Sequence, residues 1–483
     1  MQKKTKWGAI LALILIASML MSFGACAAPA EDAGAESVLI CMDQSQDVTL
    51  SFQLNEAQLA AIEAAGADAV EWTLQRTATY ANAGEIHPIN GETALFPNEK
   101  DVIPLKELTY GAPSRWVTPF GVVADSVTAS VDGSTLTLSF STTAAVSRGN
   151  VSIPHSNGGD FLDICGVFTL TGTAGETTVA TQENFTVKPY ESYHTMWEIY
   201  AEIDRLASLG DDDASTAKPY VVKKSMGSST AGYDMPYLIV AKDSKAVSNW
   251  LALAERAETE PEAVLKDLQS GKLKDFQVPV LYSNIHANET AASDAVLEFA
   301  AMLVENDKIE YTKLTGLTDA GKAKVEAQRA AQGLHTPELV AEMTSYLGAI
   351  WPSDESQTSG VVENFDSYYE SEETVITVDE LLDDVFFLLV PEENVEGRLY
   401  NTRTSSNGFD LNRDNSFQVT NETQNMQQLI GMYNPVTHVE LHGQVVGYQV
   451  EPCDPPHEPN VEYDLLSKHL MYGGEAFGAA AVA

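Results

Sequence analysis

The segment that decides the fold is Val278-Pro-Val-Leu-Tyr-Ser-Asn-Ile-His-Ala-Asn-Glu289. It opens on an apolar run that predicts a strand, and residues 293–304 follow with the apolar spacing of a helix. A strand that ends here and turns into a helix directs His286 and Glu289 at one point. Imidazole nitrogen and carboxylate oxygen are zinc ligands, and catalytic zinc sites take three such ligands plus an open position. The His-x-x-Glu spacing alone occurs by chance in many proteins.

Strands alternate with helices on both sides of this segment. Thr195-Met-Trp-Glu198 has the capping-box pattern and starts a helix that ends at Gly210. Apolar runs predict further strands at 220–223, 237–240, 386–390 and 436–441. This alternation predicts an α/β domain over residues 190–483, with insertions at 244–277 and about 308–373.

Residues 36–188 have a different pattern, with short alternating runs separated by turn residues. Residues 48–54, 127–131 and 136–140 alternate, and Asp132-Gly133 predicts a hairpin turn between the last two. Further strands are predicted at 161–171 and 177–187, and one helix at 56–65. Regular short strands of this kind predict an all-β, Ig-like β-sandwich, which we interpret as a spacer or binding module.

The first 26 residues have the composition of a secretory signal. Lys3, Lys4 and Lys6 precede an apolar stretch over 10–21. Small residues before Cys26 resemble a bacterial lipobox, which would make Cys26 a lipidated first residue. Cleavage by an ordinary signal peptidase near 25–27 is the alternative. We therefore expect an exported protein, either a cell-surface lipoprotein or secreted, whose only membrane contact is a possible lipid anchor.

Charge and cysteine content limit the partners and the type of metal site. The formal net charge is −41, which disfavours nucleic acid and anionic lipid as partners. None of the four cysteines has Cys-x-x-Cys spacing, so a cysteine zinc site is not expected. Cys41 and Cys165 are candidates for a disulfide in the N-terminal region, which would leave Cys453 alone. The sequence predicts no oligomeric state.

Residues 190–483 resemble the zinc carboxypeptidase family, the carboxypeptidase A-like metallopeptidases. The resemblance rests on five stretches in the family's order: His286-Ala-Asn-Glu289, Asn394-Val-Glu-Gly-Arg398, Arg403, Asn407-Gly-Phe-Asp-Leu-Asn-Arg413 and Glu440-Leu-His-Gly443. It implies an α/β domain with a mixed central sheet and a Zn²⁺ ion held by His286, Glu289 and His442.

The resemblance also implies roles for residues around the metal. Asp410 would accept a hydrogen bond from the first zinc histidine and so fix its tautomer. Arg403 would polarise the scissile carbonyl, which makes it the catalytic residue of this set. Asn412 and Arg413 would hold the terminal carboxylate of a peptide substrate. Arg398 is a weaker candidate for the role of Arg403, because the family places a turn residue there.

His438 is an alternative to His442 as the third metal ligand. Its spacing from His442 would put both imidazoles on one face of a helix, but the residues between them favour a strand. Four residues along a strand span roughly 13 Å, too far for both to reach one ion. We therefore expect His438 to be structural, or to support a metal ligand.

The family also uses a glutamate general base well after the third ligand, and residues 443–483 contain no match for it. We accordingly expect a C-terminally truncated open reading frame and an incomplete α/β domain with an unpaired sheet edge.

The function predicted is that of a zinc metallocarboxypeptidase acting on peptides, including cell-wall or dietary peptides. Asn288 stands where some pancreatic-type members carry an arginine, and this favours a peptidoglycan stem peptide as substrate. The alternatives are a non-catalytic surface protein with a degenerate peptidase domain, and a related amide hydrolase acting on a small molecule.

Overall fold

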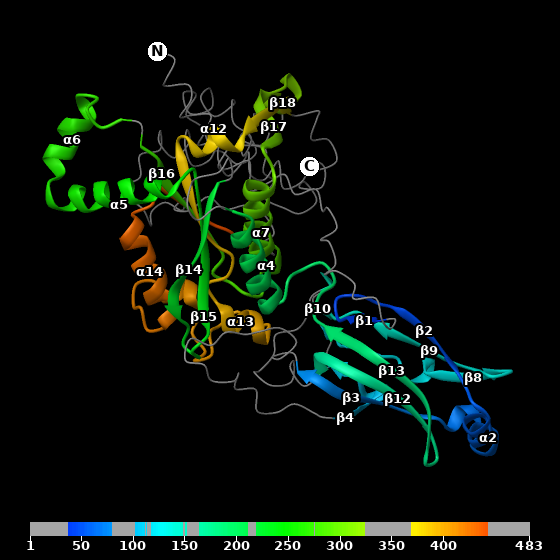
Figure 1. The fold of residues 1–483 in the computed structure, drawn as a ribbon. Coiled ribbons are helices and arrows are strands. Elements are labelled where there is room, and N and C mark those ends of the chain that lie inside the picture. Colours follow the sequence, from blue (N-terminus) through cyan, green and yellow to red (C-terminus); the bar gives the residue numbers. More distant parts are fainter. Residues whose placement is uncertain are drawn as a thin grey trace.

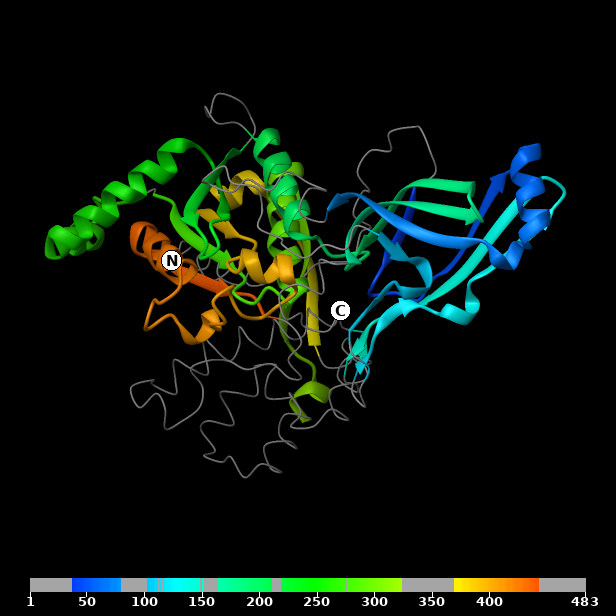
Figure 2. The ribbon, with the colours of Figure 1, turned by 90° about the horizontal axis from the view of Figure 1, so that it is seen from below.

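The computed structural model describes residues 37–79, 102–111, 113, 117–147, 150–151, 164–210, 219–274, 276–323 and 369–442. The predicted signal segment, Cys26, Cys453 and the segment after His442 lie outside these residues. The chain forms an all-β part and an α/β part, which Figures 1 and 2 show as two lobes.

The N-terminal part consists of two five-stranded sheets. The first has the order β1-β13-β12-β3-β4, and the second the order β2-β9-β7-β5 with β8 paired to β9. The strands are β1 (Val38–Cys41), β2 (Asp47–Gln53), β3 (Glu71–Thr79), β4 (Val102–Pro104), β5 (Thr109–Tyr110), β7 (Phe120–Val122), β8 (Thr128–Asp132), β9 (Thr135–Thr143), β12 (Gly166–Ala174) and β13 (Thr177–Lys188). A small third sheet joins β6 (Val117–Thr118), β10 (Val146–Ser147) and β11 (Asn150–Val151).

The two large sheets pack face to face. Aromatic rings meet between them, with Phe52 against Trp72 at 5.7 Å between ring centroids and Phe140 against Phe185 at 6.4 Å. The predicted hairpin is present, since Asp132 pairs with Thr135 and Gly133 has a φ of +59° that favours glycine. Helix α2 (Glu56–Ala65) begins at a capping box formed by Asn55. The packing is that of a β-sandwich, and its assignment to the Ig-like class stays a prediction.

The predicted Cys41–Cys165 disulfide is wrong in this structure. Both cysteines are buried and unbonded, and the Cys165 Sγ lies 3.7 Å from the sulfur of Met42. The reason is packing, because both side chains are buried as small apolar groups, and Cys165 is part of the sandwich core.

The α/β part is built on a mixed sheet with the order β14-β15-β19-β16-β20. Its strands are β14 (Tyr220–Ser228), β15 (Asp234–Ala241), β16 (Val278–Ser283), β19 (Val385–Val390) and β20 (Thr437–Glu440). Strands β14, β15 and β19 pair antiparallel, whereas β16 pairs parallel with both β19 and β20. Every residue of β16 and β19 is buried, as expected for central strands covered on both faces.

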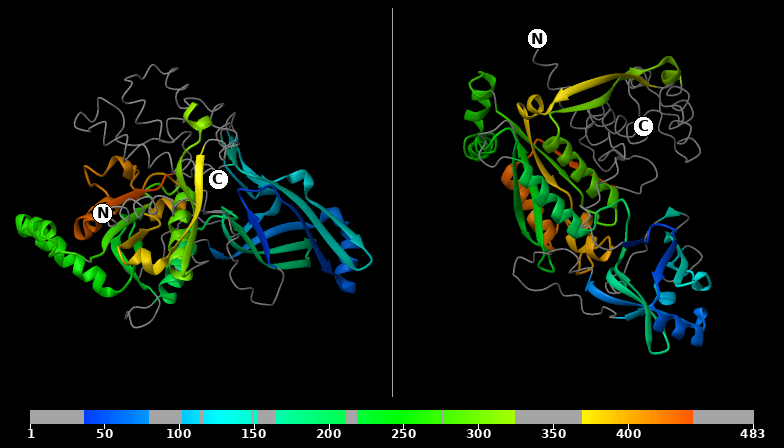
Figure 3. Two further views of the ribbon diagram at one scale, coloured as in Figure 1. Left: turned by 90° about the horizontal axis from the view of Figure 1, so that it is seen from above. Right: turned by 45° about the vertical axis from the view of Figure 1, so that its right-hand side comes forward.

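Helices cover both faces of this sheet (Figures 1 and 3). Helices α4 (Met196–Leu209) and α7 (Thr290–Glu305) pack on one face and on each other. Helices α5 (Ser244–Thr259) and α14 (Asn421–Tyr433) pack on the other. The remaining elements of this part are α6 (Pro261–Gln269), α12 (Val378–Leu382), α13 (Val395–Tyr400) and the antiparallel pair β17 (Lys308–Leu317) and β18 (Tyr369–Thr377).

Two sequence expectations about α7 and the insertions are refined. Helix α7 begins at Thr290, three residues earlier than predicted, because Glu289 is its N-cap. The first predicted insertion forms α5 and α6, and the second begins and ends as the β17–β18 pair. None of the helices that the structure describes is long and apolar enough to cross a bilayer.

Candidate metal centre

The candidate site lies at the carboxyl ends of the parallel strands β16, β19 and β20. In open α/β sheets this edge is where ligands bind, because loops that follow neighbouring strands meet there. His286 follows β16 by three residues, and His442 follows β20 by two. These two histidines, 156 positions apart in the chain, are brought together by the pairing of Ser283 with Glu440.

Local hydrogen bonds turn the end of β16 toward the helix. The Glu289 backbone N–H donates to the His286 carbonyl at 2.9 Å, and that of Ala292 donates to the Glu289 carbonyl at 2.9 Å. His286 is 2% exposed and Glu289 6% exposed. The positive end of the α7 dipole favours a carboxylate in this position.

Donor atoms of three residues converge at the site. The His286 Nδ1 lies 3.1 Å from Glu289 Oε1 and 3.0 Å from His442 Nδ1, and His442 Nδ1 lies 3.0 Å from Glu289 Oε2. Ligand bonds of 2.0–2.2 Å in tetrahedral geometry would separate such atoms by about 3.3 Å. The donor set and its spacing therefore fit a zinc ion, with one side of His442 partly exposed.

The other nitrogen of His286 faces Asp410. Nε2 lies 3.3 Å from Asp410 Oδ1. Burial alone would raise the pKa of Asp410, but the hydrogen bond and charge of Arg403, with the nearby His286 and the Asn412 N–H, hold it below its usual range. An ionised Asp410 keeps a proton on Nε2 and leaves Nδ1 free to bind a metal, as in carboxylate–histidine–zinc arrangements.

Arg403 lies beside both acids of the site. Its Nε donates to Asp410 Oδ2 at 2.9 Å, and its Nη1 donates to Glu289 Oε1 at 3.1 Å. The side chain is 34% exposed, so part of the guanidinium faces outward. Asn394, the N-cap of α13, holds the loop by donating to the Arg403 carbonyl at 3.0 Å.

The turn after Asp410 presents the other two predicted residues. Residues Leu411–Arg413 form a short 3₁₀ turn. Asp410 is its N-cap and accepts a hydrogen bond at Oδ1 from the Asn412 N–H at 3.0 Å. Arg413 is exposed and makes no ion pair with any residue in the described ranges. Its Nη1 donates to the Asn412 carbonyl at 2.9 Å.

Arg398 has a structural environment. It is 2% exposed and donates to the carbonyls of His194 and Ala287, at 3.0 and 3.1 Å, and to Asp294 at 3.3 Å. Its guanidinium also lies 5.4 Å from the centre of the Tyr190 ring. These contacts are consistent with the prediction that Arg398 is a weaker candidate than Arg403 for the catalytic role.

A second polar cluster next to the site was missed by sequence reasoning. Glu393, His438 and Glu440 each place one ligand-type atom within 4.8 Å of the others. Burial raises the pKa of Glu393 to about 7, and that of Glu440 well above its usual value. The spacing of His438, Glu440 and His442, every second residue, could have indicated this cluster from the sequence. The position of Glu393 could not, because it depends on the pairing of β16 with β19 and β20.

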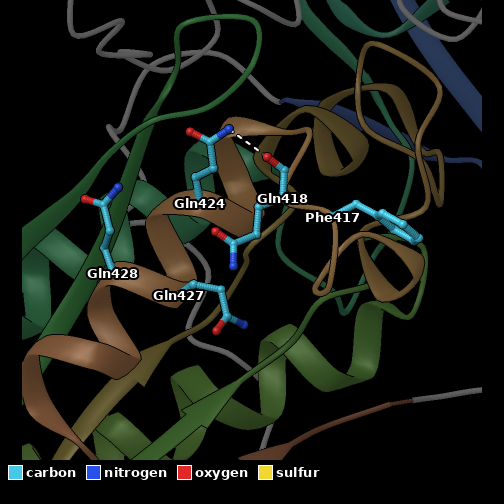
Figure 4. Close-up of a pocket in the computed structure, with 5 residues that line it drawn as sticks. All are labelled: Phe417, Gln418, Gln424, Gln427 and Gln428. Atoms are coloured by element: carbon cyan, nitrogen blue, oxygen red, sulfur yellow. Dashed lines mark hydrogen bonds between the residues drawn. The ribbon is translucent and has the colours of Figure 1, made fainter.

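A shallow pocket of about 650 Å³ is lined by residues that follow the Asn412–Arg413 turn in the chain. Figure 4 shows its lining, Phe417, Gln418, Gln424, Gln427 and Gln428, with the Gln424 amide donating to the Gln418 carbonyl at 2.8 Å. It contains none of the residues predicted for the site.

Comparisons with known proteins give matches to solved structures alone. No family model and no curated protein matches. A metallo-carboxypeptidase from Burkholderia cenocepacia is 13% identical, with a TM-score of 0.26, over 68% of this chain and 50% of that chain. A "putative carboxypeptidase" from Burkholderia mallei is 11% identical, with a TM-score of 0.25, over 83% of this chain and 56% of that chain.

A third structure, a "Putative carboxypeptidase A" from Shewanella denitrificans, is 12% identical with a TM-score of 0.24, over 86% of this chain and 66% of that chain. The chain thus spans about half the length of the first of these proteins. Likenesses of this size carry no argument about activity. The three solved structures named here carry the description carboxypeptidase or putative carboxypeptidase.

Proposed function

We propose that this chain is a zinc-dependent metallocarboxypeptidase that hydrolyses the peptide bond next to a free C-terminal carboxylate. The observation that carries the proposal is the convergence of His286 Nδ1, Glu289 and His442 Nδ1 at mutual distances of 3.0–3.1 Å. Bound there, zinc supplies a Lewis acid that polarises a carbonyl and lowers the pKa of a water molecule.

Arg403 and Asp410 then have separate tasks. Asp410 keeps the His286 ring in the tautomer that frees Nδ1. Arg403 places a fixed positive charge at the edge of the donor set, where it stabilises negative charge that develops on a carbonyl oxygen. The two are joined by their own hydrogen bond, so the guanidinium is oriented before a substrate arrives.

Arg413 and Asn412 supply recognition of the chain end. The exposed guanidinium has no competing carboxylate among the residues that the structure describes. A planar guanidinium binds a carboxylate through two parallel hydrogen bonds, which favours a substrate with a free terminus over an amidated one. In this proposal the protein is exported and its partner is a peptide, with cell-wall stem peptides included among the substrates.

The test measures zinc content and peptide turnover on the same preparation. The expected result is one ion at this centre and release of the last residue from a C-terminal peptide library, with amidated versions of the same peptides resistant. Metal bound without turnover, also in a chain extended through the whole open reading frame, would contradict the proposal in favour of a non-catalytic binding protein. Turnover of amidated peptides alone would indicate an amide hydrolase of different specificity.

A further inference from the structure

A second donor set lies beside the proposed centre and uses none of its ligands. Strand β20 is extended, so His438 and Glu440 point to the same side of the sheet, and His442 follows two residues after the strand ends. Residues two apart on a strand are separated by roughly 6.6 Å, which makes the two sets neighbours without shared atoms. The second set consists of His438, Glu440 and Glu393, the last from the loop after β19.

Ser283 fixes the orientation of two of these side chains. Its Oγ lies 2.8 Å from His438 Nε2 and 3.1 Å from Glu440 Oε2, and those two atoms are 3.5 Å apart. Glu393 is fixed through its backbone, because its N–H donates to the Asn284 carbonyl at 2.9 Å. Ser283 and Asn284, at the end of β16, thus hold residues that come from β20 and from the loop after β19.

The cluster leaves carboxylate oxygens unsatisfied. The Oε1 atoms of Glu393 and Glu440 are both buried and have no hydrogen-bond partner among the described residues. Glu393 is only 2% exposed, and a buried carboxylate oxygen without a donor is costly. A cation within reach of both would compensate that cost.

We propose that Glu393, His438 and Glu440 form a second site for a divalent transition-metal ion, distinct from the His286–Glu289–His442 centre. One imidazole and two carboxylates are a donor set that zinc and manganese accept, whereas calcium prefers oxygen alone. The side chains of His438 and Glu440 are 31% and 27% exposed, so an ion has access from solvent. The charge of two carboxylates matches that of a divalent ion.

The test counts ions in the full chain with each site altered separately. Protein stripped with a chelator is dialysed against Zn²⁺ and its metal content measured, with circular dichroism as a check on folding. We expect two ions in the unaltered chain, one in His286→Asn, and one in Glu393→Gln. Zn²⁺ should raise the melting temperature of His286→Asn, and the affinity measured in that variant should fall at least tenfold when His438→Gln is added.

The failures of the two sites are distinguishable. If folded His286→Asn binds no zinc and shows no Zn²⁺-dependent rise in melting temperature, the second site is overturned, and Glu393 and Glu440 instead share a proton. If the unaltered chain binds one ion that Glu393→Gln loses and His286→Asn keeps, the second site stands and the proposed peptidase centre fails.

Discussion

At the residue scale, the centre depends on where each proton sits. In the proposed centre His286 would bind a metal through Nδ1 only while Nε2 keeps its hydrogen, and Asp410 is the group that faces Nε2 at 3.3 Å. The ligand and its supporting carboxylate are 124 positions apart in the chain, so their contact belongs to the fold.

Substitution of Asp410 by asparagine tests this support. The amide keeps the shape and loses the charge, so we expect zinc affinity to fall about 10–100-fold with little loss of folding. Competition with a chromophoric chelator measures the affinity. Asp379→Asn, an exposed acid on α12, is the control and should leave it unchanged. An unaltered affinity in Asp410→Asn would contradict the tautomer argument.

Substitution of Arg403 should reduce turnover without reducing metal binding. Replacement by glutamine removes the cation next to Glu289, so we expect kcat/KM to fall on the order of 10²–10³-fold. The zinc content should stay at the level of the unaltered chain. Arg256→Gln, at the α5–α6 surface, serves as the control. Full activity in Arg403→Gln would remove this residue from the catalytic set.

Arg413 should act on substrate binding. Its replacement by alanine deletes a charged hydrogen-bond donor worth about 1.5–3 kcal/mol, so KM for peptides with a free terminus should rise about 10–100-fold. Amidated peptides offer no carboxylate, and their slower cleavage should be unaffected. Steady-state kinetics on a matched pair of peptides measures both values. An equal loss on both peptides would contradict carboxylate recognition.

At the element scale, buried carboxylates anchor loops to helices near the site. Glu422 in the first turn of α14 accepts hydrogen bonds from the backbone N–H and hydroxyl of Thr230, at 3.1 and 2.6 Å. Glu396 of α13 accepts one from the Ser406 N–H at 2.9 Å and another from Ala231. Burial, and then the nearby charge of Glu396, raise the pKa of Glu422 to about 7.

This raised pKa predicts how stability depends on pH. A carboxyl that titrates near 7 when folded and near 4.5 when unfolded gives its full stabilisation below pH 4.5 and loses it as pH rises through 7. We expect Glu422→Gln to lessen the fall in unfolding free energy between pH 5 and 8 by about 2–3 kcal/mol. Chemical denaturation at each pH measures this, and Glu258→Gln on α5 is the control. If the unfolding free energy of Glu422→Gln fell more steeply between pH 5 and 8 than that of the unaltered chain, the raised pKa of Glu422 would be contradicted.

At the scale of the whole molecule, the two parts meet around Tyr190, between β13 and α4. Its hydroxyl donates to Asn401 Oδ1 at 2.7 Å, and its ring lies under the Arg398 guanidinium. Arg398 in turn holds the carbonyl of Ala287, inside the His286–Glu289 turn. A short path of contacts therefore connects the sandwich to the candidate centre.

Tyr190 variants separate the hydrogen bond from the packing. Tyr190→Phe should lower the unfolding free energy by about 1 kcal/mol, since one buried hydrogen bond is lost. Tyr190→Ala should lower it by about 3–5 kcal/mol, because a buried ring is removed. Thermal melting measures both, with Tyr193→Phe as a neighbouring control. Equal effects of the two Tyr190 changes would contradict the importance of the ring.

The sequence by itself determined the elements and the order of the motifs. The apolar runs at 278–283 and 386–390 become β16 and β19 because central strands must be apolar on both faces, and the Thr195 capping box starts α4 as predicted. The strand at His438 is likewise confirmed, since β20 covers Thr437–Glu440. Secondary-structure propensity and hydrophobic periodicity depend on short stretches of sequence, so helices and strands can be predicted without the tertiary structure.

The tertiary structure alone decided which side chains meet. The pairing of β16 with β19 and β20 brings Glu393 to Glu440, and packing inside the sandwich keeps Cys41 and Cys165 as buried thiols in place of the predicted disulfide. Such approaches depend on strand order and register, which are fixed by burial over the whole sheet. The sequence could name His286, Glu289 and His442, but the distances among them, and the second cluster beside them, come from the fold.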